Sequence, residues 1–146
     1  MASINRFAVT FVLSLFLAIF AGRPLRADPV QKDPGEHVSI IHLISNPDRY
    51  HGKVVFLSAY ATIRFEGNQL CMVPNPASSK DCLWLQYDDG PWDSKEDAQR
   101  MLRTERKWKK FHGKRISVRG TFNKDDAGHF GMFSGAIDHI TDVHER

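Results

Sequence analysis

The chain has 146 residues, a length that suits one ordinary domain and is too short for two. It carries 20 Lys and Arg residues against 17 Asp and Glu residues, but three of the basic residues and none of the acidic ones lie in the first 27 positions. Taking these three from the 20 leaves 17 residues of each sign, so the remainder is neutral when its histidines are uncharged. Binding to nucleic acid irrespective of sequence needs an excess of cationic charge, and the composition disfavours this class.

The first 27 residues have the pattern of a secretory signal peptide. Arg6 precedes an uncharged, mostly apolar run over residues 7–21, and a polar segment follows it. The run is shorter than the roughly 20 residues that cross a bilayer comfortably, and an uncleaved membrane anchor is the alternative. With cleavage after Ala27 we expect a periplasmic or secreted protein with no remaining transmembrane segment. Residues 28–37 then form a polar leader, and residues 38–146 form one domain.

The mature part holds two cysteines, Cys71 and Cys82, with ten residues between them. In an oxidising compartment an even number of closely spaced cysteines favours a disulfide bond. Two buried free thiols are the alternative, and the spacing differs from that of redox-active two-residue thiol motifs. The sequence therefore predicts a Cys71–Cys82 disulfide.

The first predicted elements are a short helix and a long strand. Ser39 can cap a helix whose apolar residues recur at three- and four-residue spacings before Pro47 stops it; because isoleucines also favour strands, a strand is the alternative. From Val54 to Glu66 the apolar pattern has period two, which predicts a strand with distinct faces. The core-facing side comprises Val55, Leu57, Ala59, Ala61, Ile63 and Phe65. Turn residues at 67–68 and a loop over 74–80 bound two further strands, over residues 69–73 and 81–87.

A longer helix is predicted to begin at Ser94 and to end at His112 and Gly113. Its acidic first turn and basic end complement the helix dipole. Glu105 interrupts an apolar stripe at helical spacing, which comprises Ala98, Met101, Leu102, Trp108 and Phe111. Two strands follow, over residues 114–123 and within residues 129–143, the second with a bulge around Gly131 and Gly135.

One pattern occurs twice. Residues 50–59 and 111–120 each join an aromatic residue, a His-Gly-Lys turn and an alternating strand. The favoured interpretation is two similar helix-to-strand junctions, with Gly52 and Gly113 as the glycines that end the helices. The alternative is a duplicated ligand site built from His51 and His112.

Five strands with a helix between the third and fourth resemble the OB-fold, a small, partly open Greek-key barrel. The segments SIIHLISNPDRYHGKVV, FHGKRISVRGTF and GHFGMFSGAI are similar to small exported bacterial OB-fold-like proteins of unassigned function. The resemblance implies a mainly β domain: a five-stranded OB-like Greek-key barrel with a helix between strands 3 and 4 and a short N-terminal helix. OB-fold proteins bind single-stranded nucleic acids, oligosaccharides or proteins, so the fold alone does not choose a ligand.

Patterns for catalysis and for metal binding are weak in this sequence. The seven histidines show no local pair at helical or strand spacing, and no carboxylate–histidine zinc motif is present. Ser134, Asp138 and His139 are close in sequence but lack a nucleophile elbow. We therefore predict no catalytic residues, no metal and no cofactor, and a metal-dependent enzyme is the least favoured alternative.

The predicted binding surface combines aromatic and basic side chains. Phe56, Tyr60 and Arg64 share the outer face of the long first strand, and Arg119 shares the corresponding face of the fourth, which is expected to pair with it. Such a surface can stack on bases, sugars or peptide side chains. Trp92, in the loop after the third strand, is a further candidate. In the alternative interpretation a helix or the C-terminal part covers this face.

These observations predict an exported, non-catalytic binding module that recognises a protein, a peptide or a glycan in the cell envelope. The alternative is an OB-fold protein that binds single-stranded nucleic acid, which export and the neutral mature charge disfavour. The basic run over residues 100–115 is interpreted as a solvated helix face, although an acidic partner would also suit it.

Overall fold

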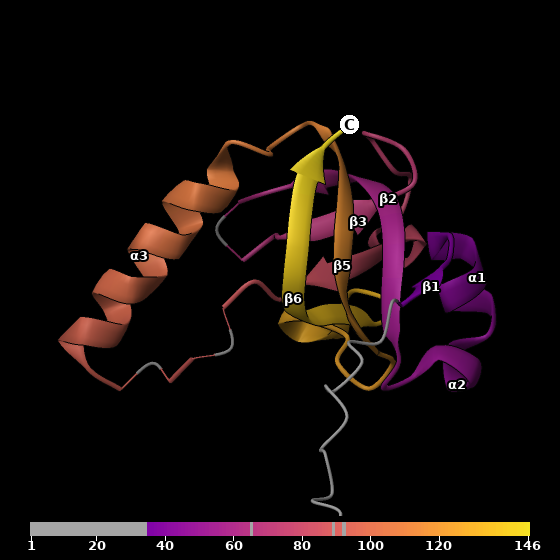
Figure 1. Cartoon of the computed structure of the whole chain (residues 1–146), viewed down its shortest axis with the longest axis horizontal. Helices are drawn as coiled ribbons and strands as arrows, with labels where there is room; N and C mark the ends of the chain where they lie inside the picture. The colour runs from indigo at the N-terminus through magenta and orange to yellow at the C-terminus, as the bar shows by residue number, and fades with distance from the viewer. Residues whose placement is uncertain (1–34, 65, 89, 92) are drawn as a thin grey trace, which may run out of the picture. The chain divides into compact units, whose positions relative to one another are not determined.

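The structure is a computed structural model, and it describes residues 35–146 apart from residues 65, 89 and 92 (Figure 1). The predicted signal peptide and most of the predicted polar leader lie outside the described residues. Among the residues described, no helix is long and apolar enough to span a membrane.

The domain is mainly β, with five strands that close into a barrel consistent with an OB-like fold. The barrel strands are β2 (Val54–Thr62), β3 (Gln69–Cys71), β4 (Cys82–Leu85), β5 (Arg115–Asn123) and β6 (Ala136–Glu145). Their order is β2-β3-β4-β6-β5, and the antiparallel pairing of β5 with β2 closes the barrel. All neighbours in this ring are antiparallel except β4 and β6, which are parallel.

The alternation along β2 sets which side chains form the core. The predicted core-facing residues Val55, Leu57, Ala59, Ala61 and Ile63 are all buried, which confirms this part of the prediction. Phe65 lies outside the described residues, and the strand ends at Thr62 rather than at Glu66. Phe122 of β5 is also completely buried. A short sixth strand, β1 (Glu36–His37), pairs in parallel with β2. These two residues belong to the predicted polar leader and are ordered here because β2 offers them an open edge.

Two short helices precede the barrel. Helix α1 (Ile40–Ser45) begins after Ser39, whose hydroxyl accepts a hydrogen bond from the His42 amide, and it buries Ile40 and Leu43 in the core. Pro47 was expected only to end this helix; in the structure it also begins helix α2 (Pro47–Tyr50). A proline is well suited to the first position of a helix, because its fixed φ is helical and no amide is needed there. Two 3-10 turns, η1 (Ser79–Asp81) and η2 (His129–Gly131), complete the elements outside helix α3.

Helix α3 (Lys95–Lys109) connects β4 to β5 and lies beside the barrel in Figure 1. The Ser94 hydroxyl accepts the Asp97 amide at 3.1 Å and thereby caps the helix. Trp108 is the one buried residue of α3, and Leu102 is 50% exposed. The predicted apolar stripe is thus only partly buried, because the last turn of the helix packs on the barrel and the earlier turns leave a cleft.

The two His-Gly-Lys segments are structurally equivalent and flank the β2–β5 pair. The Gly52 amide donates to the Phe122 carbonyl and the Gly113 amide donates to the Ala61 carbonyl, each at 2.8 Å. Both glycines have positive φ, 73° and 75°. The prediction of two similar helix-to-strand junctions is confirmed, and the two antiparallel strands are related by a local two-fold symmetry.

The histidines of these segments have matching structural contacts. His51 Nδ1 accepts the Lys124 amide at 3.3 Å, and His112 Nδ1 accepts the Ile63 amide at 3.1 Å. Each imidazole therefore extends the β2–β5 pairing by one hydrogen bond beyond the end of the opposite strand. This arrangement explains why histidine occurs twice at the same place.

We expect the substitutions Gly52→Ala and Gly113→Ala each to lower the free energy of unfolding by about 1 kcal/mol, because alanine is strained at positive φ. No atom lies within 4 Å of the added methyl group at either site, so the loss comes from the backbone alone. Urea unfolding measures both values. Gly52→Asn is the control and should cost less, since asparagine tolerates this conformation. Losses that differ by more than about 1 kcal/mol would contradict the equivalence of the junctions.

The irregular part of β6 differs from the prediction. The shift in register lies opposite Gly120 of β5, between Asp138 and Asp142, and His139 has a φ of 44°. The expected position, around Gly131 and Gly135, precedes the strand. The cause lies on the partner strand: a Cβ atom at Gly120 would stand 2.6 Å from the Asp138 carbonyl oxygen, so only glycine permits this approach.

Candidate functional site

A cleft of about 240 Å³ opens between helix α3 and the end of β4. Segments that are far apart in the sequence line it: the β2–β3 turn, the residues that follow β4, helix α3 and the loop between β5 and β6. The lining residues are Arg64, Glu66, Asn68, Trp84, Leu85, Gln86, Tyr87, Asp88, Met101, Glu105 and His129. Aromatic and apolar walls with a few converging polar groups are typical of binding sites.

A chain of hydrogen bonds along the end of β4 and the residues after it forms one wall. Trp84 Nε1 donates to Gln86 Oε1 at 2.7 Å, and Gln86 Nε2 donates to the Asp88 carbonyl at 2.5 Å. Residues two apart in an extended chain point to the same side, which brings the Trp84 and Gln86 side chains together. Hydrogen bonds within the wall hold Trp84 and Gln86 in place before any ligand binds.

Tyr87 links the cleft to the helix. Its ring stacks on Trp108 at a centroid distance of 5.5 Å and an interplanar angle of 19°. Burial raises the pKa of Tyr87; a hydrogen bond with Asn68 opposes this, and the charges of Glu105 and Asp88 add to the increase.

Asp88 is the most unusual side chain of the cleft, because it is buried, with 7% of its side chain exposed. Its Oδ1 accepts the Gly90 amide at 3.0 Å and lies 3.5 Å from Nε of Arg100. Its Oδ2 is buried and has no hydrogen-bond partner among the described residues. Buried polar atoms are nearly always paired with protein groups or with ordered water, so this oxygen has capacity to accept a further hydrogen bond.

Arg100 compensates Asp88 only in part. Its guanidinium also forms an ion pair with Asp97 and donates to the Pro91 carbonyl at 2.8 Å. The Ser94 hydroxyl and then Arg100 lower the pKa of Asp97, which is therefore ionised near neutral pH. One arginine is thus shared between two carboxylates.

The β5–β6 loop forms the rim of the cleft and presents an exposed aromatic ring. Phe130 is 88% exposed and has a φ of 53°, and its ring lies 4.0 Å from that of His129. His129 Nε2 is 3.4 Å from a carboxylate oxygen of Glu66 on the opposite side of the cleft. Phe130 is the most exposed large apolar side chain among the described residues, and it stands beside the cleft.

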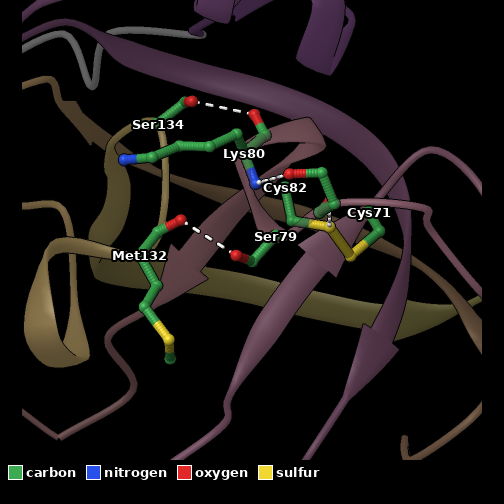
Figure 2. The surroundings of a disulfide bond; sticks show 7 residues. Cys71, Ser79, Lys80, Cys82, Met132 and Ser134 are labelled. Carbon is green, nitrogen blue, oxygen red and sulfur yellow. Dashed lines mark hydrogen bonds between the residues drawn. A yellow bond between two sulfur atoms is a disulfide. The ribbon is translucent and has the colours of Figure 1, made fainter.

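The predicted disulfide is present, and it lies next to the anchor of this loop (Figure 2). It joins Cys71 and Cys82, which face one another on β3 and β4. Nearby, Lys80 Nζ donates to the carbonyls of Gly131 and Phe133 at 2.8 and 3.0 Å. Figure 2 also shows hydrogen bonds from Ser134 to the Lys80 carbonyl and from Ser79 to the Met132 carbonyl. Turn η1 thus fixes the loop that carries Phe130.

The residues predicted to bind do not lie together. Phe56 pairs directly with Arg119 on the outer face of β2 and β5, and Tyr60 shares that face. Arg64 instead lines the cleft. Trp92 lies outside the described residues.

The outer face of β2 and β5 is partly covered by the two ends of the domain. Phe56 lies between the rings of His37 and His144, at centroid distances of 4.6 and 6.1 Å. Arg146 Nε donates to the Ser117 hydroxyl at 2.8 Å, and Ser117 is fully buried. The alternative prediction, that the C-terminal part covers this face, is therefore correct for part of the face.

Sequence reasoning missed most of the cleft. One signal for it existed: Glu105 interrupts the apolar stripe of α3, and a carboxylate in such a stripe is expected to face something other than the core. Asp88, Glu66 and His129 carried no comparable signal, because only the folded chain brings them together.

Other candidate centres are occupied by structural contacts. Ser134 Oγ donates to the Lys80 carbonyl, and His139 Nδ1 is 2.8 Å from Asp138 Oδ1. Within the part of the chain that the structure describes, no group of three or more His, Cys, Asp or Glu residues is arranged to hold a metal ion. Comparisons with protein-family models, with curated proteins and with solved structures found no significant match to this chain.

Proposed function

We propose that this protein is an exported, non-catalytic binding module that recognises a protein, a peptide or a glycan of the cell envelope. We further propose that its barrel is an OB-like Greek-key barrel, preceded by short helices and with a helix between the third and fourth barrel strands. The ring order, the parallel β4–β6 pair and the position of α3 support this assignment. The Cys71–Cys82 disulfide and the apolar N-terminal run support export.

The observation that carries the binding proposal is the cleft beside α3. It combines aromatic walls, from Trp84 and Tyr87, with the buried Asp88 carboxylate oxygen that has no partner among the described residues. Leaving a buried polar atom unpaired costs about 1–3 kcal/mol, which a ligand that pairs it would recover. The cleft therefore suits a ligand that supplies both a flat or apolar contact and a hydrogen-bond donor.

The proposed site disfavours nucleic acid as the ligand. Three carboxylates line the cleft, from Glu66, Asp88 and Glu105, against the single arginine Arg64. A phosphate backbone would be repelled from such a surface. The nucleic-acid alternative would have to use the outer face around Phe56 and Arg119 instead.

Arrays of peptides and of glycans, probed with the purified protein, test the proposal. Met101→Trp fills the cleft, and we expect it to weaken binding of every ligand found by about tenfold or more, because the ligand loses its contact surface. Phe56→Ala removes the aromatic ring of the outer face and should leave those ligands bound. Thermal unfolding shows whether both variants are folded.

Two outcomes would contradict the proposal. One is the absence of any ligand on either array, and the other is a set of ligands lost with Phe56→Ala and kept with Met101→Trp. A fluorescent single-stranded oligonucleotide, titrated at low and high salt, examines the alternative. Binding that falls steeply with salt would favour nucleic acid.

A further inference from the structure

The cleft beside α3 has an excess of negative charge that the described residues do not balance. Glu66 has a partner in His129, but only when that histidine is protonated. Glu105 forms no ion pair with any residue that the structure describes. Together with the incompletely compensated Asp88, these groups favour a cation in the cleft.

Of the three carboxylates in the cleft, that of Asp88 favours a nearby cation most strongly. Its Oδ2 is enclosed and unpartnered among the described residues, and the arginine near its Oδ1 is shared with Asp97. Tyr87, Asp88 and Glu105 line the same cleft, so the two carboxylates lie beside an aromatic wall. A cation is worth more in such a partly buried setting than in water.

The size and walls of the cleft restrict the ligand further. Its volume of about 240 Å³ is smaller than that of most sites for drug-sized molecules and suits a single long side chain. Met101, Trp84 and Tyr87 offer apolar surface to an aliphatic stem, and carboxylates line the same cleft. Lysine and arginine have this combination of an apolar stem and a cationic head.

The loop at the rim of the cleft offers a second contact for a bound polypeptide. Phe130 projects next to His129 on a loop that Lys80 fixes through two backbone carbonyls. The anchored backbone fixes where this exposed aromatic ring stands, so a bound polypeptide can bury it without reordering the loop. Neutral glycans would leave the charge of the cleft unbalanced.

We infer that the cleft receives the basic side chain of a peptide or protein, with Asp88 and Glu105 providing the charge and Phe130 an apolar contact at the rim. This inference rests on the proposed function, and it narrows the ligand from three classes to a cationic polypeptide.

The test compares two probes of nearly the same shape, N-acetyl-arginine amide and N-acetyl-citrulline amide. Citrulline lacks the positive charge and has a carbonyl oxygen in place of one guanidinium nitrogen. Each is titrated into the purified protein and followed by the NMR signals of the backbone amides that line the cleft. We expect the arginine compound to bind about two- to fivefold more tightly, the effect of one partly exposed ion pair. Equal affinity for the two compounds would overturn the inference.

Three variants are expected to change the preference for the arginine compound in opposite directions. Glu105→Gln and Asp88→Asn should each reduce the preference for arginine, and Asp88→Asn should reduce it more because its carboxylate is buried. Arg64→Gln should increase it, because this exposed arginine repels a cation at the entrance. A loss of affinity with Arg64→Gln, or a stronger response to N-acetyl-glutamate amide than to the arginine compound, would also overturn the inference.

The array and NMR experiments together distinguish failure of the proposed function from failure of the inference about a basic side chain. Ligands on the peptide or glycan arrays that depend on Met101 but show no preference for cations would retain the proposed function and refute the basic side chain. Absence of binding in both experiments would refute both proposals.

Discussion

The double substitution Cys71→Ser with Cys82→Ser is expected to lower the free energy of unfolding by about 3 kcal/mol. The disulfide closes a loop with a sequence separation of 11 residues, and its loss gives the unfolded chain more conformations. Both cysteines are buried, at 2% and 0% exposure, so the new hydroxyl groups also lack water. Calorimetry should show a melting temperature lower by about 10 °C.

Reduction of the wild-type protein provides the control for this prediction. A reducing agent should lower the melting temperature of the wild type to near that of the double variant and leave the variant unchanged. Mass spectrometry without reduction should show the Cys71 and Cys82 peptides linked. Two alkylatable thiols, or a wild type that is insensitive to reduction, would contradict it.

The loop that carries Phe130 depends on a second position, Gly128. We expect Gly128→Ala to cost about 3 kcal/mol, because two separate effects act there. The backbone has φ 62° and ψ −159°, a conformation almost confined to glycine. An added Cβ atom would also lie 2.7 Å from the Trp84 ring and 2.8 Å from the Phe133 ring. Urea unfolding measures the loss.

Gly131 offers a matched comparison on the same loop. Its φ is also positive, at 67°, but no atom lies within 4 Å of an added Cβ. Gly131→Ala should therefore cost only about 1 kcal/mol. Equal losses at the two positions would show that the contact of Gly128 with Trp84 and Phe133 is unimportant. Because the same contact positions the rim of the cleft, Gly128→Ala should also weaken cleft ligands more than Gly131→Ala does.

These predictions share one structural cause. The disulfide, Lys80 and Gly128 all hold the β5–β6 loop against the barrel. Phe133 packs against the disulfide pair, which connects the anchor of the loop to the β3–β4 hairpin. The backbone that carries the rim of the proposed site is therefore held in place by these contacts. Loss of the disulfide is expected to reduce both the stability of the domain and its ligand binding.

Local patterns in the sequence were sufficient for several parts of the fold. The period of two from Val54 onward predicted the buried face of β2, since alternation is a property of any extended chain. The spacing of Cys71 and Cys82 predicted their disulfide. The His-Gly-Lys segments predicted two equivalent junctions, because a glycine with positive φ is a local requirement for leaving a helix.

The tertiary structure alone decided the remaining features, because they depend on contacts between distant segments. Gly120 determines where β6 becomes irregular, although the irregularity lies on the other strand. Arg64 shares a periodicity with Phe56, yet lies in the cleft because β2 ends at Thr62 and the chain turns there. Glu105 and Asp88 become one charged site only when α3 returns past the end of β4. Periodicity assigns a side chain to a face, but the closure of the barrel and the course of the loops decide which faces meet.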